Sequence, residues 1–319
     1  MLTILYGTHD TRIDITSTVK EKCAKGSMFY IPPDDNLRAK LFSDPIFGKV
    51  KHIFIGGESY DHNTPIFIDT HGTVHTHSIP KEIQDVYPEE SARVALHALH
   101  KTLVLHHGNM KDELSEQKMA LRFIDASSKV LEIGGNIGRN SLVIATLLTP
   151  SNPLLSPSLA MLPFVTLESD PKIAKQLEEN RDANRFRFHI EPSALSLRPL
   201  IQKGWDTLVS DTVFEGYTKV NTITLDELRN KYKVSFNTLV LDCEGAFFYI
   251  LQDMPSILDG IHTILMENDY RNVSHKEYID SILSERGFTC VYREALGSEY
   301  AHLKFPCQKN FFEAWKCTS

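Results

Sequence analysis

The chain has little cysteine and no cysteine arrangement that could serve as a structural framework. It holds five cysteines among 319 residues, and no two of them form a C-x-x-C pair. An odd number without paired spacing argues against a disulfide scaffold and against a zinc ribbon. We therefore expect a protein of a reducing compartment, the cytoplasm.

Long apolar runs and an excess of positive charge are also missing. No stretch of about 18 apolar residues is present, so we expect neither a membrane-spanning helix nor a membrane partner. The N-terminus lacks a charged segment followed by an apolar one, so no signal peptide is expected. The formal net charge is −7. Because surfaces that bind nucleic acid through its phosphates are basic, nucleic acid is not the expected partner.

Residues 1–85 form the first of two expected domains. Short apolar or β-branched segments, separated by Gly, Pro, Asp and Asn, predict strands at 2–6, 27–31 and 52–55. A hairpin is expected over 64–74, with its turn near His71 and Gly72. We predict a small β-rich accessory module, a candidate for self-association or acceptor binding, and the oligomeric state stays open.

Residues 86–319 form the second expected domain and differ in pattern. Helical periodicity at 90–106 and 112–124 precedes a regular alternation of strands and helices. Strands are expected at 130–133, 164–167, 186–190, 238–241 and 261–266, and helices at 140–148, 173–184, 247–252 and 275–286, and the segment 289–293 and the C-terminal region close the chain. This alternation predicts an α/β fold with a Rossmann-like parallel sheet and helices on both faces. A proline-rich loop over 150–163 and a strand pair or insertion over 206–223 interrupt it.

A glycine-rich loop joins the strand at 130–133 to its helix. Gly134, Gly135, Asn136 and Gly138 lie in it. Glycines let the backbone turn sharply and approach a ligand closely, and the start of the helix offers free N–H groups. The spacing departs from the G-x-G-x-x-G of dinucleotide-binding enzymes. The preceding acid, Glu132, would suit the ammonium of a methionine-derived cofactor, and a turn that binds nothing is the alternative.

Acidic residues end three further strands of the expected sheet. Glu168, Asp242 and Glu267 each follow an apolar run. In open α/β sheets ligands bind at the carboxyl ends of the strands, so we expect these acids and Glu132 to face one crevice. At the end of the second strand, Glu168 could accept both hydroxyls of a ribose.

These segments together resemble the FkbM family of S-adenosylmethionine-dependent methyltransferases. The run 130–138 resembles the first motif of the family, and Leu241-Asp242-Cys243-Glu244-Gly245 resembles its most specific signature. Further similar segments are 167–171 with Leu177 and Asn180, 194–196, 223–228 and 266–267, so the resemblance covers roughly 112–293. The chain departs from the family at Val240, where lysine is common, and at Phe248, near which an acid is usual.

The resemblance implies O-methylation of a hydroxyl, and we expect the acceptor to be a sugar or glycan. It implies a methyltransferase domain over 86–319 and S-adenosylmethionine as the cofactor. The residues expected to bind this cofactor are Glu116, Glu132, Gly134, Gly135, Asn136, Gly138, Glu168, Ser193, Ala194 and Asp242. Among them, Glu116 lies on the helix before the first sheet strand, where it would meet the methionine end.

A hydroxyl is a weak nucleophile at neutral pH, so a base or a metal is expected beside it. Asp242 is the first candidate for the base, and Glu267 and His275 are further catalytic candidates. A Mg²⁺ ion held by Asp242, Glu267 and Asp269 is an additional hypothesis, because a hard cation prefers carboxylate oxygens.

Two rival functions stay open. An RNA cap ribose 2′-O-methyltransferase relies on a Lys-Asp-Lys-Glu set, and both Val240 and the acidic balance of the chain speak against it. A non-catalytic binding or scaffold protein on the same fold is the second rival. The presence of all the cofactor-side motifs disfavours it.

Overall fold

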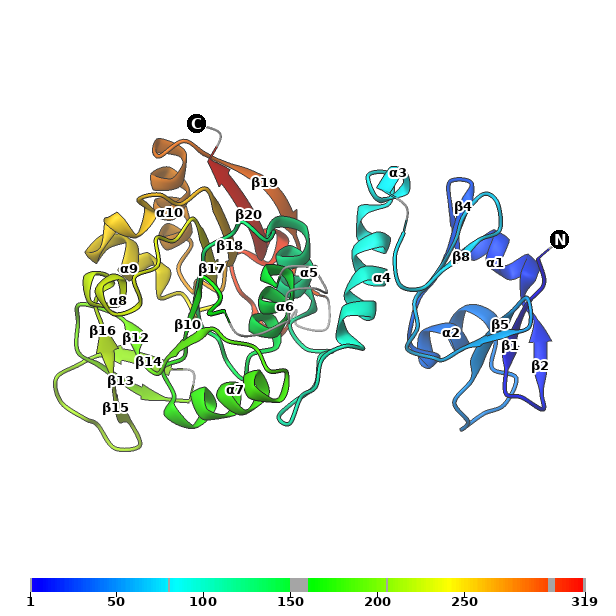
Figure 1. Ribbon diagram of the computed structural model, residues 1–319, viewed down its shortest axis with the longest axis horizontal. Coiled ribbons are helices and arrows are strands. Elements are labelled where there is room, and N and C mark those ends of the chain that lie inside the picture. Colours follow the sequence, from blue (N-terminus) through cyan, green and yellow to red (C-terminus); the bar gives the residue numbers. More distant parts are fainter. Residues whose placement is uncertain (1, 80, 150–159, 205, 298–301, 318–319) are drawn as a thin grey trace. The chain divides into compact units, whose positions relative to one another are not determined.

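The computed structural model describes residues 2–79, 81–149, 160–204, 206–297 and 302–317. The chain folds as two compact units, Met1–Thr102 and Leu103–Ser319 (Figure 1). Residues 150–159 of the expected proline-rich loop lie outside the described residues. No helix in the described ranges has the length and apolar character needed to cross a membrane.

The first unit contains two four-stranded sheets, with strand orders β2-β1-β5-β6 and β3-β4-β7-β8. Its strands are Ile4–Gly7 (β1), Arg12–Asp14 (β2), Ala24–Lys25 (β3), Met28–Ile31 (β4), His52–Ile55 (β5), Glu58–Tyr60 (β6), Ile66–Ile68 (β7) and Val74–His75 (β8). Its helices are Thr16–Lys22 (α1), Asp35–Phe42 (α2), Lys81–Gln84 (α3) and Pro88–His100 (α4). The expected hairpin is β7–β8.

The helices α1 and α2 were not expected from the sequence, and α2 contributes the least expected core residue, Arg38. This side chain is fully buried. Its guanidinium donates to the carbonyl oxygens of Pro32 (2.8 Å), Asp61 (2.8 Å) and Thr64 (2.5 Å). The buried charge is tolerated because three of the guanidinium nitrogens each donate to a backbone carbonyl oxygen.

Replacing Arg38 with Leu is therefore expected to destabilise the first unit by about 3 kcal/mol or more, since buried carbonyls would lose their donors. Urea unfolding, with hydrogen exchange followed over residues 2–79, would measure the change. Arg93→Leu is the matched control, because Arg93 is exposed and pairs with Glu89 on the same helix, an interaction worth roughly 0.5 kcal/mol. Equal effects of the two substitutions would contradict this role of Arg38.

The second unit is built on a seven-stranded sheet of order β11-β10-β9-β17-β18-β20-β19. Its strands are Val130–Ile133 (β9), Phe164–Leu167 (β10), His189–Glu191 (β11), Thr238–Leu241 (β17), Thr263–Glu267 (β18), Phe288–Glu294 (β19) and Phe312–Cys317 (β20). The helices are Leu114–Phe123 (α5), Arg139–Leu148 (α6), Pro171–Ala183 (α7), Leu225–Tyr232 (α8), Phe247–Asp253 (α9) and Val273–Glu285 (α10), with 3₁₀ turns at Pro255–Leu258 (η1) and Gln308–Asn310 (η3). Strands β11, β10, β9, β17 and β18 are parallel to one another, and β20 pairs antiparallel with both β18 and β19.

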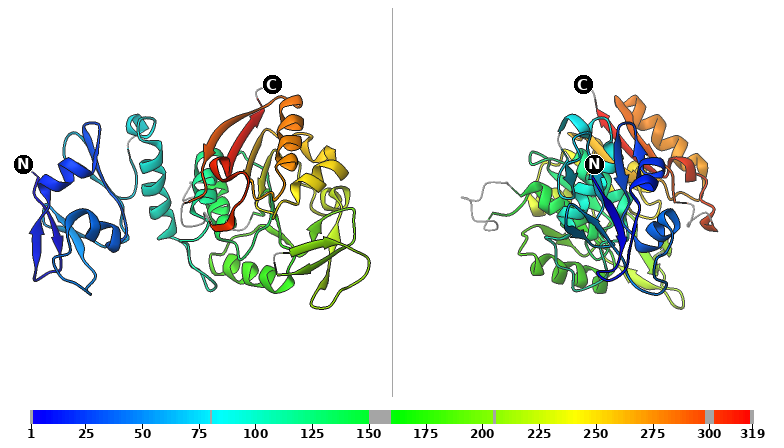
Figure 2. Two further views of the ribbon diagram at one scale, coloured as in Figure 1. Left: turned by 180° about the vertical axis from the view of Figure 1, so that it is seen from behind. Right: turned by 90° about the vertical axis from the view of Figure 1, so that its right-hand side faces the viewer.

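Helices cover both faces of this sheet: α8, α9 and α10 lie on one side, and α5 and α6 lie on the other (Figures 1 and 2). Side chains alternate between the two faces along each strand. Leu131 and Ile133 of β9 pack in the core formed with α8, α9 and α10. Val130 and Glu132 consequently face α5 and α6. The expected α/β fold with a Rossmann-like sheet is confirmed.

The interruption expected over 206–223 is a small antiparallel sheet of order β14-β13-β15, together with the parallel pair β12–β16. Its strands are Ala194–Leu195 (β12), Leu200–Lys203 (β13), Asp206–Val209 (β14), Thr218–Val220 (β15) and Thr222–Ile223 (β16). The helix expected over 90–106 ends at His100 in the structure. Beyond Thr102 the backbone leaves the helical path, because the N–H of Val104 donates to the side chain of Asn184 (2.8 Å).

Candidate active site

The register of the parallel strands explains why acids gather at one edge of the sheet. Thr166, Glu132 and Val240 are neighbours across β10, β9 and β17, and Val240 is paired with Leu265 of β18. Two residues further along each chain, the same face carries Glu168, Gly134, Asp242 and Glu267. A period of two along each strand therefore places three acids and one glycine in a row at the carboxyl edge. The strand order reverses between β9 and β17, which is where open α/β sheets bind ligands.

The glycine in this row is required by close backbone packing. Gly134 has φ +95°, and a Cβ built on it would lie 1.5 Å from the carbonyl oxygen of Asp242. A Cβ on Gly135 would lie 2.3 Å from Oγ1 of Thr166. Both N–H groups donate to the carbonyl of Leu167 (3.0 and 2.8 Å), which holds the loop against β10. The loop can thus turn tightly between the strand ends and leave the edge of the sheet open.

Glu168 is fixed by backbone donors on both of its oxygens. Oε2 accepts from the N–H of Asn136 (2.9 Å), and Oε1 accepts from the N–H of Asp170 (2.8 Å). The side chain is buried, and this burial raises the pKa of the carboxyl. Each carboxylate oxygen has a second lone pair, so this rigid group can still accept hydrogen bonds from a vicinal diol.

A cleft with a volume of ≈ 670 Å³ opens at this edge. It is large enough for a nucleotide-sized ligand. Expected cofactor-binding residues that line it are Gly134, Asn136, Glu168, Ser193, Ala194 and Asp242. Its other walls include β14 of the small antiparallel sheet, the ring of Tyr249 on α9, and the ion pair between Arg198 and Asp253, which is bidentate with both distances 2.6 Å.

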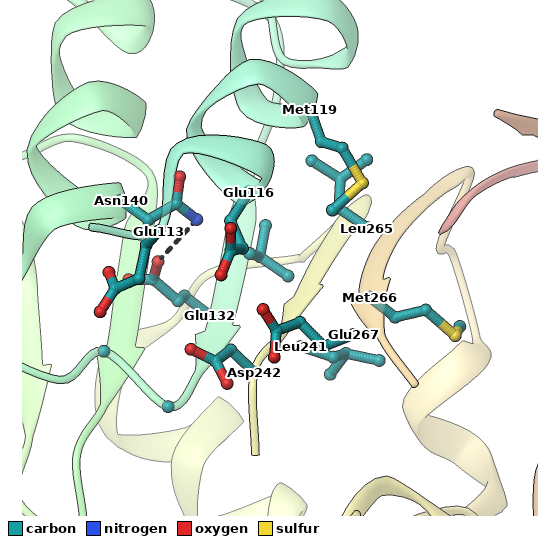
Figure 3. A pocket seen from close by; sticks show the side chains of 13 residues that line it. Glu113, Glu116, Met119, Glu132, Asn140, Leu241, Asp242, Leu265, Met266 and Glu267 are labelled. Atoms are coloured by element: carbon teal, nitrogen blue, oxygen red, sulfur yellow. Dashed lines mark hydrogen bonds between the residues drawn. The ribbon is translucent and has the colours of Figure 1, made fainter. Parts of the chain in front are cut away.

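A second, much smaller cavity of ≈ 10 Å³ adjoins the cleft, and Gly134 and Asp242 line both spaces. Its acidic side chains come from α5, β9 and the ends of β17 and β18 (Figure 3). Carboxylate oxygens of Glu116, Asp242 and Glu267 lie within 4.8 Å of one another. Glu113 and Glu132 complete the acidic lining. We call this space the acid pocket, and it has room for about one water-sized group.

The acid pocket brings several carboxyl groups together in a confined space. Burial raises the pKa of Asp242 well above its usual range, and the charge of Glu116 adds to the effect. Burial likewise raises the pKa of Glu267, with further contributions from Asp242 and Glu116. None of the residues that line the pocket, within the described chain, is cationic. Arg139 lies beyond the lining and pairs with Glu113 (2.6 Å). A small cation in this pocket would relieve the repulsion.

Glu132 lies inside strand β9 and not at its carboxyl end. It is buried within β9, it accepts hydrogen bonds from the side chains of Ser141 and Asn140, and burial raises its pKa to about 7. Gly138 lies at the start of α6, where φ is +93°. Glu132 lines the acid pocket described above, whereas Gly138 is not among the described residues that line the pocket or the cleft.

The expected metal set of Asp242, Glu267 and Asp269 is brought together only in part. The group within coordinating distance contains Glu116 in place of Asp269. Asp269 lines the larger cleft instead, where it is buried with Oδ2 free of any hydrogen-bond partner. Burial raises its pKa to about 7, and the N–H groups of Gly245 and Glu244 act in the opposite direction.

His275 also lines the larger cleft, at the end formed by the loop after β18. Its ring stacks on Phe248 with centroids 3.8 Å apart and planes 2° apart, and Tyr249 meets it edge-on. Two aromatic neighbours therefore fix the imidazole plane. The sequence analysis did not predict this stack, because Phe248 and His275 are far apart in the sequence and only the packing of α9 against α10 brings them together.

Glu113 was missed by the sequence analysis, although it lines the acid pocket. It adopts a left-handed backbone conformation with φ +59° just before α5. Its side chain accepts from Nδ2 of Asn136 (3.0 Å) and from Arg139. Burial raises its pKa to about 7. Only the tertiary fold brings it to the glycine loop, and no local pattern marks it.

No family model matches the chain, and no curated protein matches it. Among solved structures the chain is similar to an O-methyltransferase from Bacillus cereus in complex with S-adenosylhomocysteine, at 14% identity and a TM-score of 0.39, over 74% of this chain and 96% of that chain. It is also similar to a ribosomal protein L11 methylase from Lactobacillus delbrueckii subsp. bulgaricus, at 11% identity and a TM-score of 0.38, over 66% of this chain and 79% of that chain. A third similar structure is an rRNA methylase from Streptococcus thermophilus, at 10% identity and a TM-score of 0.37, over 64% of this chain and 95% of that chain. These likenesses are distant, and the roles of the residues rest on the geometry described above.

The raised pKa values in the acid pocket predict a pH-dependent stability for the ligand-free protein. A carboxyl whose pKa is raised on folding stabilises the protein below its unfolded pKa, and this contribution is lost as the pH rises through its folded pKa. For Glu132 the two values are 4.5 and about 7. Glu267→Gln removes one of the repelling charges, so we expect it to increase the free energy of unfolding at about pH 8 and to change it little at about pH 4.5.

Urea unfolding at both pH values measures this difference. The control is Glu285→Gln, because Glu285 is exposed on α10. An equal effect of Glu267→Gln at the two pH values would contradict the repulsion inferred for the pocket.

Proposed function

We propose that this chain is an S-adenosylmethionine-dependent O-methyltransferase. The observation that carries the proposal is the row of Glu168, Gly134 and Asp242, with a ribose-binding carboxylate at one end and a buried pocket that needs a cation at the other. Neighbouring strands lie about 4.8 Å apart, so the two acids of this row are roughly 10 Å apart across two strand spacings. A nucleoside linked to a short chain that ends in an ammonium matches this layout.

The placement of each part of the cofactor follows from the lining residues. Glu168 would accept the ribose hydroxyls, and Ser193 and Ala194 would border the adenine. Glu116 and Glu267, with Asp242, would hold the methionine ammonium. A nicotinamide dinucleotide fits less well, because its pyrophosphate would bring negative charge toward the acid pocket.

The acid pocket is also a candidate Mg²⁺ site, since three carboxylate oxygens suit a hard cation. Its volume of ≈ 10 Å³ admits one small group, so an ammonium and a metal ion exclude each other there. We assign the pocket to the ammonium because Gly134 and Asp242 make it continuous with the cleft. Turnover is then expected to persist in EDTA.

The sulfonium of the cofactor supplies an activated methyl group. In the proposed reaction the S–CH₃ bond breaks, an O–CH₃ bond forms, and the hydroxyl proton of the acceptor passes to a base. Asp242 is the first candidate for this base. His275, whose ring stacks on Phe248, is the second. Either would work mainly by orienting the hydroxyl and taking its proton.

We propose a sugar or glycan hydroxyl as the acceptor. The support comes from the resemblance to the FkbM family and from the cleft wall, where the half-exposed ring of Tyr249 lies beside the paired groups of Arg198 and Asp253. An aromatic face next to planar polar groups suits a ring that is apolar on one side and hydroxylated at its edge. A capped RNA is disfavoured because Val240 occupies the position of the expected lysine.

Glu168→Ala is expected to weaken the binding of S-adenosylhomocysteine by about ten-fold or more, because charge-assisted hydrogen bonds contribute roughly 1.5–3 kcal/mol. Isothermal titration calorimetry would measure the dissociation constant. Glu178→Ala, an exposed position of α7, serves as the control and should bind like the wild type. Unchanged affinity in Glu168→Ala would show that this acid does not hold the ribose.

Asp242→Asn is expected to lower turnover by about 10²–10⁴-fold, since it removes the first candidate for the base. Binding of S-adenosylhomocysteine should largely persist, because Glu116 and Glu267 remain. Transfer of a labelled methyl group to a panel of mono- and oligosaccharides measures turnover, with a capped RNA oligonucleotide tested in parallel. Methylation of the RNA alone would reject the glycan proposal, and full activity of Asp242→Asn would leave His275 as the base.

A further inference from the structure

The buried side-chain amide of Asn180 on α7 connects two segments that are far apart in sequence. Its Oδ1 accepts from the N–H groups of His106 (2.8 Å) and His107 (3.0 Å). Its Nδ2 donates to the carbonyl oxygens of His107 (3.1 Å) and Ile137 (2.9 Å). The residue is fully buried. Four hydrogen bonds use the full capacity of the amide, two as acceptor and two as donor.

One of the connected segments is residues 103–113, which we call the strap because it crosses from α7 to the start of α5. At its beginning, the amide of Asn184 pairs with both backbone groups of Val104 (2.8 and 2.6 Å). Near its end, Arg139 donates to the carbonyl of Asn109 (3.0 Å). The strap ends at Glu113, which lines the acid pocket and accepts from Asn136.

The other connected segment is the glycine loop. Ile137, whose carbonyl meets Asn180, lies between Asn136 and Gly138, and the N–H of Asn136 donates to Glu168. The loop and the strap are therefore joined twice, through Asn180 at Ile137 and through Glu113 at Asn136. Leu177, one turn before Asn180 on α7, packs beneath Gly135 and Gly138. The apolar contact with Leu177 supports the loop from below. The four hydrogen bonds of Asn180 in addition tie the loop to the strap.

We propose that Asn180 is a positioning residue for the cofactor site. It fixes the position of the glycine loop relative to the strap. Through the loop it places the N–H of Asn136 that orients Glu168, and through the strap it places Glu113 and Glu116 at the acid pocket. Both ends of the cofactor site then depend on one buried amide that itself touches no ligand. The inference rests on the proposed function, because it concerns the same cofactor.

The test is the binding of S-adenosylhomocysteine to the full chain by calorimetry. Asn180→Leu keeps the number and branching of the side-chain heavy atoms and removes all four hydrogen bonds, and we expect its dissociation constant to rise about ten-fold or more. Asn184→Leu is the matched control, because it is the same substitution at the C-cap of the same helix and removes bonds to the strap without touching the glycine loop. Its dissociation constant should stay within about two-fold of the wild type.

Asn180→Asp provides a signature that a purely structural role would lack. A protonated aspartic acid can donate to the carbonyl of Ile137, whereas an ionised one cannot. Relative to the wild type at each pH, the affinity of Asn180→Asp should approach normal at about pH 5.5 and fall toward about pH 8. Asn180→Leu should bind weakly throughout this range. The Asp variant also keeps the test decisive if the Leu variant fails to fold.

Two failures are distinguishable. A wild-type protein that does not bind S-adenosylhomocysteine overturns the proposed function before any variant is made. If the wild type binds it and Asn180→Leu binds equally well, the positioning role alone is overturned. The same holds if the Asn180 and Asn184 variants lose affinity together and Asn180→Asp shows no pH dependence.

Discussion

The repulsion among crowded carboxylates at one edge of a parallel sheet is the constraint on which the site depends. The buried Glu116 and the half-buried Asp242 and Glu267 meet in a small cavity, and Glu113 and Glu132 line the same space. Carboxylates this close repel one another when all are ionised, and a cation among them would relieve the repulsion. The fold tolerates the arrangement because the sheet behind it is covered by packed helices, and the site acquires a strong preference for a positively charged group.

The sheet itself accounts for much of this geometry. Parallel pairing of β10, β9, β17 and β18 brings their carboxyl ends level, and the alternation of side chains sends Glu168, Asp242 and Glu267 to one face. These features follow from apolar runs that end in an acid, which is why the sequence predicted the fold class and the crevice. The strands at 130–133, 164–167 and 238–241 were predicted to the residue for the same reason: they are short and apolar, and turn-forming or acidic residues bound them.

The parts that sequence could not predict are those decided by tertiary contacts. Glu113 reaches the acid pocket only because the strap crosses to α5, and Asp269 was expected there but lines the larger cleft. The helix expected to reach residue 106 ends at His100, and the N–H of Val104 donates to the side chain of Asn184 in place of a helical carbonyl. In the first unit, a short helix with a buried arginine has no apolar stripe to reveal it. Asn184 and the buried arginine are polar side chains that pair with distant backbone groups, and such pairing leaves no periodic signal.

The measurement that bears most directly on the central claim is a calorimetric comparison of S-adenosylhomocysteine with NAD⁺ on the unmodified chain. A site with a ribose carboxylate at Glu168 and a cation-seeking acid pocket should bind one equivalent of S-adenosylhomocysteine, with a dissociation constant on the order of micromolar, about −8 kcal/mol. NAD⁺ should bind far more weakly, because its pyrophosphate is anionic. Binding of NAD⁺ without binding of S-adenosylhomocysteine would contradict the assignment of this edge to a sulfonium cofactor.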